Sequence, residues 1–363
     1  MRISRTATYA LGVLAAAALV AGCSGSGSQS GALTPSSVGS AAVHHASPLH
    51  RGLQDTFIAV KPYSVHPDHK KSYVSPAVKN APRLLFASDS GTDDVYIYTL
   101  PALSLKGTLT GFSEPQGECA DGSGNIYIAN TGTYQVLEYS RTGTLLNTFD
   151  DSYGYPVGCS VWGNDLAVTN IFGFSGTGQV LVYSISDPSG SPTVLENPDQ
   201  YYYYFDGYDT SGNLWVSGKD DSGYYILSDC AAGGTSCSTI SLSGGTIYFP
   251  GSVVYDSITT SWYAADQLCG DTTAACFYPV STSGSLGTAI NLDTYEGGDA
   301  CDVVQATIAA PFGLKYAAGG DYEYCGNTAS TENRWPWTAG GKPTNYNDGG
   351  QISTPIGAAV SVK

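Results

Sequence analysis

Histidine and arginine are scarce in this sequence, and where they lie excludes several kinds of chemistry. All five histidines lie within the first 69 residues, so residues 70–363 contain none. That part of the chain therefore cannot build a Ser-His-Asp or Cys-His catalytic site, or a metal site with histidine ligands. Beyond Arg83 the only arginines are Arg141 and Arg334, too few for the convergent arginines of sialidase-like chemistry.

Positive charge is also scarce after the first quarter of the chain. Residues 1–83 contain eight Lys or Arg and two Asp or Glu, a net charge of +6. Residues 84–363 therefore hold 15 − 8 = 7 basic and 31 − 2 = 29 acidic residues, a net charge of −22. An acidic domain of this kind repels phosphate backbones and anionic lipid surfaces. We therefore expect no nucleic-acid partner.

The first 22 residues have the pattern of an export signal. Arg2 and Arg5 precede an apolar segment, Ala7–Leu19, that is too short to span a membrane. Small residues then lead into Cys23, an arrangement that resembles the lipobox of bacterial lipoproteins. The resemblance implies a signal peptide over residues 1–22, a lipid on the Cys23 thiol, and attachment to the membrane of the cell envelope. Because residue 24 is serine rather than aspartate, it implies the outer membrane if the host is Gram-negative. An ordinary signal peptide with an incidental cysteine is the alternative.

Residues 23–82 are expected to form a flexible tether. The stretch from Ser24 to Ser40 is rich in glycine and serine, and the rest contains several prolines with little hydrophobic periodicity. A histidine cluster can bind a transition metal, but no neighbouring cysteine or carboxylate pattern supports such a site over a solvated spacer. The histidines are His44, His45, His50, His66 and His69.

A short β-rich unit recurs from residue 83 onward, at intervals of 41, 40, 48, 48 and 53 residues. Each unit has a hydrophobic central strand followed by a turn residue, and in most units a further alternating strand follows. Repeats of this length that form β-meanders are the blades of propellers, so we expect an all-β fold, a six-bladed β-propeller over residues 83–363. Because Asp, Asn and Gly favour tight turns, we expect turn roles rather than ligand contact at the aligned positions. These positions are Asp89, Asn130, Asn170, Gly218, Asp266 and Gly319.

A Pro-x-Gly motif marks the start of an innermost strand in each unit. The last copy begins at Pro355, and the chain ends before a central strand can follow it, whereas the first unit lacks an inner strand. The C-terminal segment is therefore predicted to close the ring as the inner strand of the first blade, which also removes an open sheet edge. The clear copies are Pro115–Gly117, Pro156–Gly158 and Pro355–Gly357, and the degenerate ones are Phe205–Gly207, Pro250–Gly251 and Glu296–Gly298.

Eight cysteines remain when Cys23 is set aside, an even number that suits disulfides in an exported protein. No Cys-x-x-Cys spacing and no nearby histidine favours a metal site instead. Two pairs of cysteines are each separated by six residues at expected strand ends, which favours the local disulfides Cys230–Cys237 and Cys269–Cys276. Matched places on successive inner strands favour Cys119–Cys159, and the remaining pair would be Cys301–Cys325.

The segment Asp121–Gly132, preceded by Pro115-Gln-Gly117, resembles an NHL-type repeat. The similarity extends over the first three units and more loosely over the fourth and fifth. NHL repeats usually carry a basic residue just before the third strand, where this chain has Gln135. RNA-binding NHL domains rely on basic faces, so the resemblance does not imply RNA binding here.

Two functional hypotheses follow from the side chains near the inner strands. Carboxylates such as Glu118, Asp206 and Asp302 could converge in the central channel around a hard cation such as Ca²⁺, as in gluconolactonase-like propellers, and serve a metal-assisted hydrolase or lactonase. The favoured hypothesis is a non-catalytic binding or scaffold propeller that needs no cofactor and recognises a glycan, a peptide or an envelope protein.

Tyrosines precede several inner strands, and in a propeller such loops gather around one mouth of the channel. Tyrosine offers a flat apolar body with a polar tip, suited to sugars or peptides. The alternative is that these aromatic residues pack between blades. The candidate ligand-binding residues are Glu114, Gln116, Tyr155, Tyr203, Tyr204, Asp206, Glu296 and Asp299.

Overall fold

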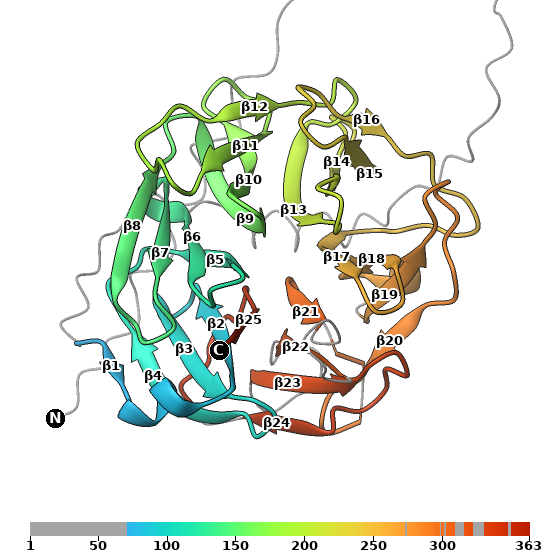
Figure 1. Ribbon diagram of the computed structural model, residues 1–363. Helices are drawn as coiled ribbons and strands as arrows, with labels where there is room; N and C mark the ends of the chain where they lie inside the picture. The colour runs from blue at the N-terminus through green and yellow to red at the C-terminus, as the bar shows by residue number, and fades with distance from the viewer. Residues whose placement is uncertain are drawn as a thin grey trace, which may run out of the picture. The chain divides into compact units, whose positions relative to one another are not determined.

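The computed structural model describes residues 71–272, 274–297, 299–300, 303–308, 316–321, 330–347 and 350–363. Within these ranges the chain forms six antiparallel sheets, arranged as a ring (Figure 1). The predicted all-β, six-bladed propeller is therefore confirmed. No helix in the described ranges is long and apolar enough to cross a membrane.

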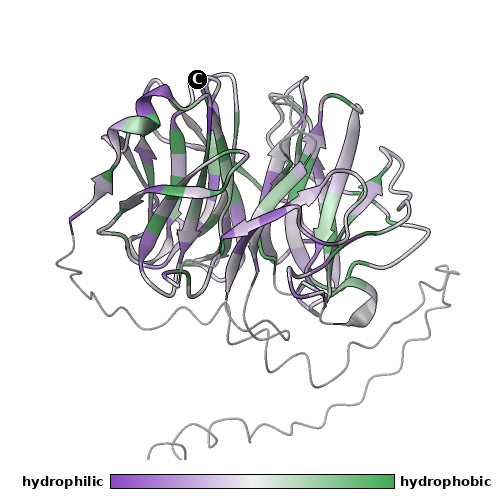
Figure 2. Ribbon diagram, turned by 90° about the horizontal axis from the view of Figure 1, so that it is seen from below, coloured by the Kyte–Doolittle hydropathy of each residue, from purple (hydrophilic) through white to green (hydrophobic). Residues whose placement is uncertain are grey.

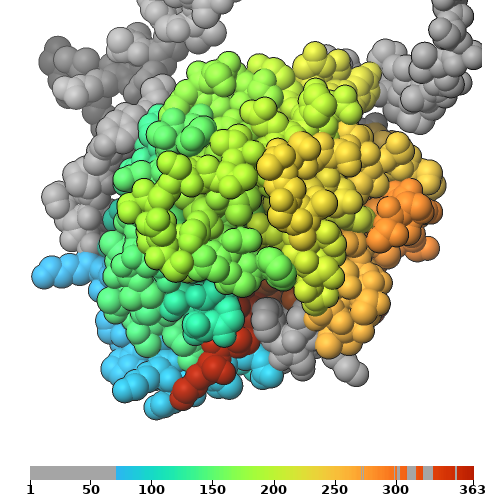
Figure 3. Space-filling model, turned by 45° about the horizontal axis from the view of Figure 1, so that its top comes forward, coloured from blue at the N-terminus to red at the C-terminus, as the bar shows by residue number. Residues whose placement is uncertain are grey.

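The first blade is closed by the C-terminal strand, as the unpaired Pro-x-Gly copy predicted. Its strand order is β1-β4-β3-β2-β25, and β25 pairs antiparallel with β2 from Phe86↔Ala359 to Arg83↔Val362. In Figure 3 the C-terminal segment (red) lies between the first blade (blue) and the second (teal). The strands are β1 (Tyr73–Val74), β2 (Arg83–Asp89), β3 (Asp94–Thr99), β4 (Ser104–Leu109) and β25 (Ala359–Val362).

Residues within the segment predicted as tether pack on this blade. Strand β1 pairs with β4, and a 3-10 helix, η1 (Pro76–Asn80), follows it. The side chain of Ser75 caps this helix, and proline suits its first position. Val78 is fully buried in a core with Leu84 and Phe86. The packed part of the molecule therefore begins about ten residues before Arg83.

Each of the other five blades is a four-stranded meander whose strands follow one another from the inside outward. Two further 3-10 helices, η2 (Thr131–Thr133) and η3 (Cys269–Asp271), lie in the second and fifth blades. The second blade is β5 (Pro115–Ala120), β6 (Ile126–Asn130), β7 (Gln135–Tyr139) and β8 (Leu145–Asp150); the third is β9 (Gly154–Trp162), β10 (Asp165–Gly173), β11 (Gln179–Ser184) and β12 (Thr193–Leu195); the fourth is β13 (Tyr202–Tyr208), β14 (Leu214–Lys219), β15 (Tyr225–Cys230) and β16 (Ser238–Thr239); the fifth is β17 (Pro250–Asp256), β18 (Ser261–Asp266), β19 (Ala275–Val280) and β20 (Ile290–Leu292); the sixth is β21 (Ala306–Ile308), β22 (Tyr316–Asp321), β23 (Thr331–Pro336) and β24 (Asn345–Asn347).

The hydrophobic core lies between the blades rather than at one centre. Apolar residues are concentrated in the strands (Figure 2), and separate clusters join neighbouring sheets. Between the fourth and fifth blades, for example, Trp215 stacks on Trp262 with ring centroids 4.4 Å apart. The fold therefore depends on packing between successive repeats, which none of the repeats can provide alone.

Hydroxyl groups at the ends of central strands tie successive blades together. Ser88 donates to the backbone carbonyl of Gln116, Thr169 to that of Tyr204 at 2.6 Å, and Ser217 to that of Gly251 at 2.9 Å. Each bond therefore joins the central strand of one blade to the inner strand of the next. These contacts fix the inner strands around the ring axis.

The aligned turn residues of the first and fifth blades have the structural roles expected of them. The Asp89 carboxylate accepts backbone N–H groups of Gly91, Thr92, Ser353 and Thr354. In the fifth blade Asp266 accepts three such groups in the same way.

Two details of the predicted repeat alignment are wrong. In the first blade the turn residue Asp89 forms the last pair between β2 and β3, with Asp94. The corresponding last pair between β22 and β23 is Asp321 with Thr331, so the sixth turn residue is Asp321 rather than Gly319. In the third blade the entry residue Pro156 pairs with the turn residue Asn170. In the fourth blade the residue that pairs with the turn residue Gly218 is Tyr203, so the entry motif starts there and not at Phe205. A poorly matched repeat can slip by two residues and still keep its hydrophobic alternation, which explains the fourth-blade error.

The sixth inner strand is also displaced from its predicted start. It is β21, which pairs with β22 from Ala306↔Gly319 to Ile308↔Ala317. The predicted entry at Glu296–Gly298 instead follows β20, where Glu296 lies in a turn, and Gly298 lies outside the described residues.

Three of the predicted disulfides are confirmed. Cys119–Cys159 joins the inner strands of the second and third blades, with the two Cα atoms 5.6 Å apart. Cys230–Cys237 and Cys269–Cys276 close short loops in the fourth and fifth blades. Cys301, Cys325 and the lipidation residue Cys23 lie outside the described residues.

Candidate ligand-binding site

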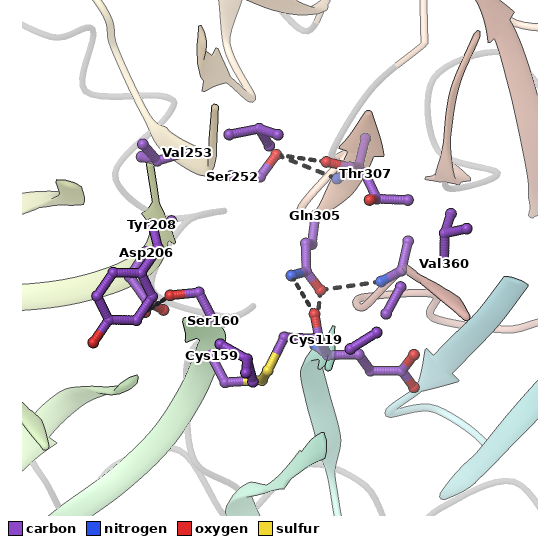
Figure 4. Close-up of a pocket in the computed structure, with 18 of the residues that line it drawn as sticks. Cys119, Cys159, Ser160, Asp206, Tyr208, Ser252, Val253, Gln305, Thr307 and Val360 are labelled. Carbon is purple, nitrogen blue, oxygen red and sulfur yellow. Dashed lines mark hydrogen bonds between the residues drawn. A yellow bond between two sulfur atoms is a disulfide. The ribbon is translucent and has the colours of Figure 1, made fainter. Parts of the chain in front are cut away.

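A cavity of about 190 Å³ lies at the ring axis, toward the carboxyl ends of the six inner strands (Figure 4). We call it the carboxyl-end cavity. Every inner strand contributes to its wall, so the closed ring is a condition for its existence. The lining residues are Glu118–Ala120, Cys159–Val161, Asp206–Tyr208, Ser252–Tyr255, Gln305–Thr307 and Ala358–Val360.

Asp206 is the polar centre of one side of this cavity. Its side chain is only 6% exposed, and the Ser160 hydroxyl donates to Oδ2 at 2.6 Å. The other oxygen, Oδ1, is buried and makes no hydrogen bond among the described residues. Burial raises the pKa of Asp206 to about 7, although the Ser160 hydrogen bond opposes the shift. The carboxyl can therefore change its protonation state near neutral pH.

Gln305 joins three inner strands on the opposite side. Its Oε1 accepts the backbone N–H groups of Glu118, at 2.8 Å, and Ala358, at 3.0 Å, while its Nε2 donates to the Glu118 carbonyl (Figure 4). The sixth blade is thereby bonded to the first and second at the axis. We infer that Gln305 is a structural element of the cavity wall, because its amide groups are already paired.

Aromatic and hydroxyl side chains complete the cavity. Tyr208 and Tyr255 line the cavity near the carboxyl ends of adjacent inner strands. Next to them lies Trp162, which is 39% exposed and whose ring centroid is 6.3 Å from that of Tyr208. The Ser252 hydroxyl donates to the Ala306 carbonyl at 3.0 Å. The cavity therefore combines the desolvated carboxyl group of Asp206, and the backbone and side chain of Glu118, with apolar ring surfaces and hydroxyl groups.

A second axial cavity, also lined by described residues, lies toward the amino ends of the inner strands. This cavity of about 30 Å³ is lined mainly by apolar side chains, including Val157, Phe205, Phe249 and Ile356. Val157, Phe205 and Phe249 belong to a compact cluster with Ile171 and Leu268. The two cavities are therefore chemically different, and of these two the one at the carboxyl end is the larger.

The eight predicted ligand residues do not form one site. Asp206 lines the carboxyl-end cavity, whereas Gln116 and Tyr204 line the small cavity at the amino end. Tyr203 is fully buried, and its hydroxyl donates to the Asn197 carbonyl and accepts from the Asn197 N–H. The alternative of aromatic packing between blades is therefore what the structure shows for Tyr203.

Glu114 and Tyr155 lie near the amino end of the channel, away from Asp206. Tyr155 forms a trio of edge-to-face rings with Tyr134 and Phe174, whose centroids are 5.1 to 5.6 Å apart. Electrostatic interaction places Glu114 near Tyr134. Because the rings contact one another directly, no ligand group can enter between them.

The remaining two predicted residues, Glu296 and Asp299, lie in the segment after β20. Both are exposed. The hydroxyl of Tyr295 donates to Glu296 at 3.3 Å, and Asp299 forms a β-bridge with Asp293. Neither lines either of the two axial cavities.

Two buried carboxyl groups beside the first blade have no hydrogen-bond partner among the described residues. Glu118 is 1% exposed, and its Cγ would lie 3.0 Å from a Cβ added to Gly357. Glu332 of the sixth blade lies near Gly320, and its interaction with Glu118 adds to the effect of burial. Burial raises the pKa of both carboxyl groups well above the usual range. Burial therefore favours the neutral acid form of both groups.

The alternative of a calcium site in the central channel has no ligand set among the described residues. No group of three or more His, Cys, Asp or Glu side chains within that part of the chain could hold a metal ion. Asp302 lies outside the described residues. No arrangement seen here therefore favours the metal-assisted hydrolase over a binding protein.

Ser160, Tyr208, Tyr255 and Gln305 are cavity residues that the sequence did not single out. They carry no motif, and three of them lie on inner strands whose register could be set only by pairing. One signal was available: Ser160 and Tyr208 follow the Pro-x-Gly entries at the positions where an inner strand passes the ring axis. With the slip in the fourth blade corrected, Ser160 lies four residues after its entry residue Pro156, and Tyr208 lies five residues after Tyr203, so the two occupy adjacent positions of the repeat.

Comparisons with known proteins support the fold and do not name a function. No protein-family model and no curated protein matches the chain. Among solved structures, one described as a nidogen/laminin complex aligns with a TM-score of 0.59 and 12% identity, covering 77% of this chain and 98% of the other. A protein of unknown function from Bacteroides caccae aligns with a TM-score of 0.56 and 16% identity, covering 78% and 100%. A functionally unknown protein from Desulfotomaculum acetoxidans DSM 771 aligns at 0.50 and 8%, covering 77% and 99%. At these low sequence identities, the comparisons establish the propeller fold alone.

Proposed function

We propose that this protein is a non-catalytic, NHL-like binding propeller that takes the end of a glycan, a peptide or a protein segment into the carboxyl-end cavity. The cavity itself is the observation that carries the proposal. It is concave, it has about 190 Å³ of space, and it places the carboxyl group of Asp206 among hydroxyl groups and tyrosine rings. Sites of this composition hold ligands through apolar contact and gain specificity from a few polar groups.

The proposed ligand can also be a segment of a partner protein. The structure described as a nidogen/laminin complex is one of the similar propellers, so the fold is compatible with a scaffold role. The net charge of −22 beyond residue 83 disfavours anionic ligands, because like charges repel. Neutral and cationic ligands are therefore the expected classes.

The experiment is an array of oligosaccharides and peptides probed with the full chain and two variants. Thr307→Trp places a large ring inside the cavity, since Thr307 lines it, and is expected to abolish binding. Thr193→Trp is the matched control, because Thr193 is exposed on the outer strand β12. The proposed site would be contradicted if Thr307→Trp and Thr193→Trp bound the array ligands equally well, or if the full chain bound none of them.

Attachment to the cell envelope through Cys23 is a separate part of the proposal. It rests on the lipobox-like sequence Val20-Ala21-Gly22-Cys23. We expect Cys23→Ala to abolish incorporation of labelled palmitate and to move the protein from the membrane fraction to the soluble fraction. An unchanged membrane fraction would mean that another feature holds the protein there.

A further inference from the structure

The volume of the carboxyl-end cavity limits what it can hold. An engineered cavity of roughly 150 Å³ admits a benzene molecule. The carboxyl-end cavity, at about 190 Å³, therefore has room for one ring-sized group and not for a folded chain segment. Because apolar side chains of the described residues pack the amino end of the channel, we expect a long ligand to insert only its terminal group.

The charge around Asp206 indicates what that group should carry. No Lys, Arg or His is among the described residues that line the cavity. A desolvated carboxylate without a cation is costly, and a buried polar atom without a hydrogen bond is costly as well. Oδ1 of Asp206 is buried and has no hydrogen-bond partner in the part of the chain that the structure describes, while Oδ2 accepts the Ser160 hydroxyl. A ligand that brings both a positive charge and N–H donors would remove both costs.

The rest of the cavity suits an ammonium group rather than a guanidinium or a metal ion. An ammonium presents three donors to acceptors in different directions. The Thr307 side chain carries an acceptor oxygen, and the faces of Tyr208 and Tyr255 can attract a cation. The Ser252 hydroxyl is already paired with the carbonyl and the N–H group of Ala306. A metal ion would require more anionic ligands than the cavity provides, since no metal-holding group exists in this part of the molecule.

We propose that the carboxyl-end cavity recognises a primary ammonium group borne on a ring-sized terminal group, with Asp206 as its anionic partner. This inference rests on the proposed binding function and deepens it. The same chemistry occurs in an amino sugar at the end of a glycan and in a lysine side chain of a peptide. Both present a protonated amine on a short apolar or hydroxylated body.

The test compares two probes that differ in one group, cyclohexylamine and cyclohexanol, by titration calorimetry with the full chain. At pH 8 we expect the Kd of cyclohexylamine to be at least tenfold lower than that of cyclohexanol. Asp206→Asn should bring the two values within twofold of each other. Asp221→Asn, an exposed position in the β14–β15 turn of the same blade, should preserve the tenfold preference.

The pH dependence provides a second readout. The titratable groups lining the cavity are Glu118 on β5, Asp206 and Tyr208 on β13, and Tyr255 on β17, and Asp165 on β10 acts on Tyr208. Because protonation neutralises Asp206, the preference for the amine should fall at least fivefold between pH 8 and pH 5.5. A preference that keeps the same pH dependence in Asp206→Asn would overturn the assignment to Asp206.

The outcomes separate this inference from the proposed function. If cyclohexanol binds as tightly as cyclohexylamine and Thr307→Trp abolishes both, the ammonium inference fails and the cavity is still a binding site. If neither probe binds and no array ligand responds to Thr307→Trp, both proposals fail. Glucosamine against glucose, and Nα-acetyl-lysine amide against its Nε-acetylated form, then show whether the amine comes from a sugar or a peptide.

Discussion

Replacing Asp206 with asparagine should make the protein more stable at neutral and alkaline pH. Asparagine has the same shape, and its Oδ1 can still accept the Ser160 hydroxyl, so the cavity wall is preserved. The substitution removes only the ability to ionise. The folded protein holds this carboxyl 6% exposed, whereas the unfolded chain exposes it to water.

The sign and the magnitude follow from the pKa difference between the two states. The pKa of Asp206 is about 7 in the folded protein, against 3.8 for a solvated aspartate. Below pH 3.8 both states are protonated, and the group has no effect on the free energy of unfolding. As the pH rises toward 7, the unfolded state releases its proton and the folded state retains it, so stability is lost. A shift of about 3 pH units corresponds to roughly 4 kcal/mol, fully developed above pH 7.

The assay is guanidinium denaturation of oxidised protein at pH 4, 6 and 8, with the unfolding free energy extrapolated to zero denaturant. The difference between Asp206→Asn and the natural chain should grow with pH, while the exposed control Asp221→Asn should show a constant difference. Glu118 and Glu332 also destabilise the folded state as the pH rises, but they are present in all three proteins and cancel. A difference that varies by less than about 1 kcal/mol from pH 4 to pH 8 would refute the desolvation of Asp206.

The remaining predictions concern the closed ring. Deletion of residues 353–363 removes β25 and exposes the edge of β2, so the melting temperature should fall as several kcal/mol of stability are lost; a truncated protein that melts like the full chain would contradict the closure. Cys119→Ser with Cys159→Ser opens a loop with a sequence separation of 40, which the chain-entropy model values at about 4 kcal/mol, measurable by denaturation. If the double variant is as stable as the oxidised protein, the disulfide does not constrain the unfolded chain. Gly357→Ala would place a Cβ near the Gln116 carbonyl and the Glu118 side chain, so we expect a loss of roughly 1–3 kcal/mol in the unfolding free energy. Gly122→Ala, where nothing lies within 4 Å, is the control, and equal losses in the two variants would exclude the clash.

The number and order of the blades could be predicted from the sequence because each repeat carries local signals. A hydrophobic central strand and a turn residue recur in every unit, and these depend on neighbouring residues only. The unpaired Pro-x-Gly copy at Pro355 then predicted the closure by β25, since a ring needs as many inner strands as central ones. The local disulfides were predicted for the same reason, because Cys230 and Cys237 face each other across a short loop.

The repeat signals were weaker where the chain departs from its own pattern. In the sixth blade the turn residue is Asp321 and the inner strand is β21, both shifted from their predicted places. The segment from Tyr73 to Asn80 has little periodicity, yet β1 pairs with β4 and Val78 enters the core. Strand β1 and the buried Val78 are held by a strand edge and an apolar surface of the adjoining sheet, and these contacts cannot be predicted from a local sequence pattern.

The sequence by itself determined the architecture, the acidic character of the propeller and the exclusion of histidine chemistry. Only the tertiary structure decided which end of the channel is open and which carboxyl groups lose their water. Asp206, Tyr203 and Tyr204 are close neighbours in the sequence, yet they face a cavity, an inter-blade core and the opposite end of the channel. The physical reason is that strand register and ring closure place residues from six distant segments around one axis, and burial at that axis sets their chemistry.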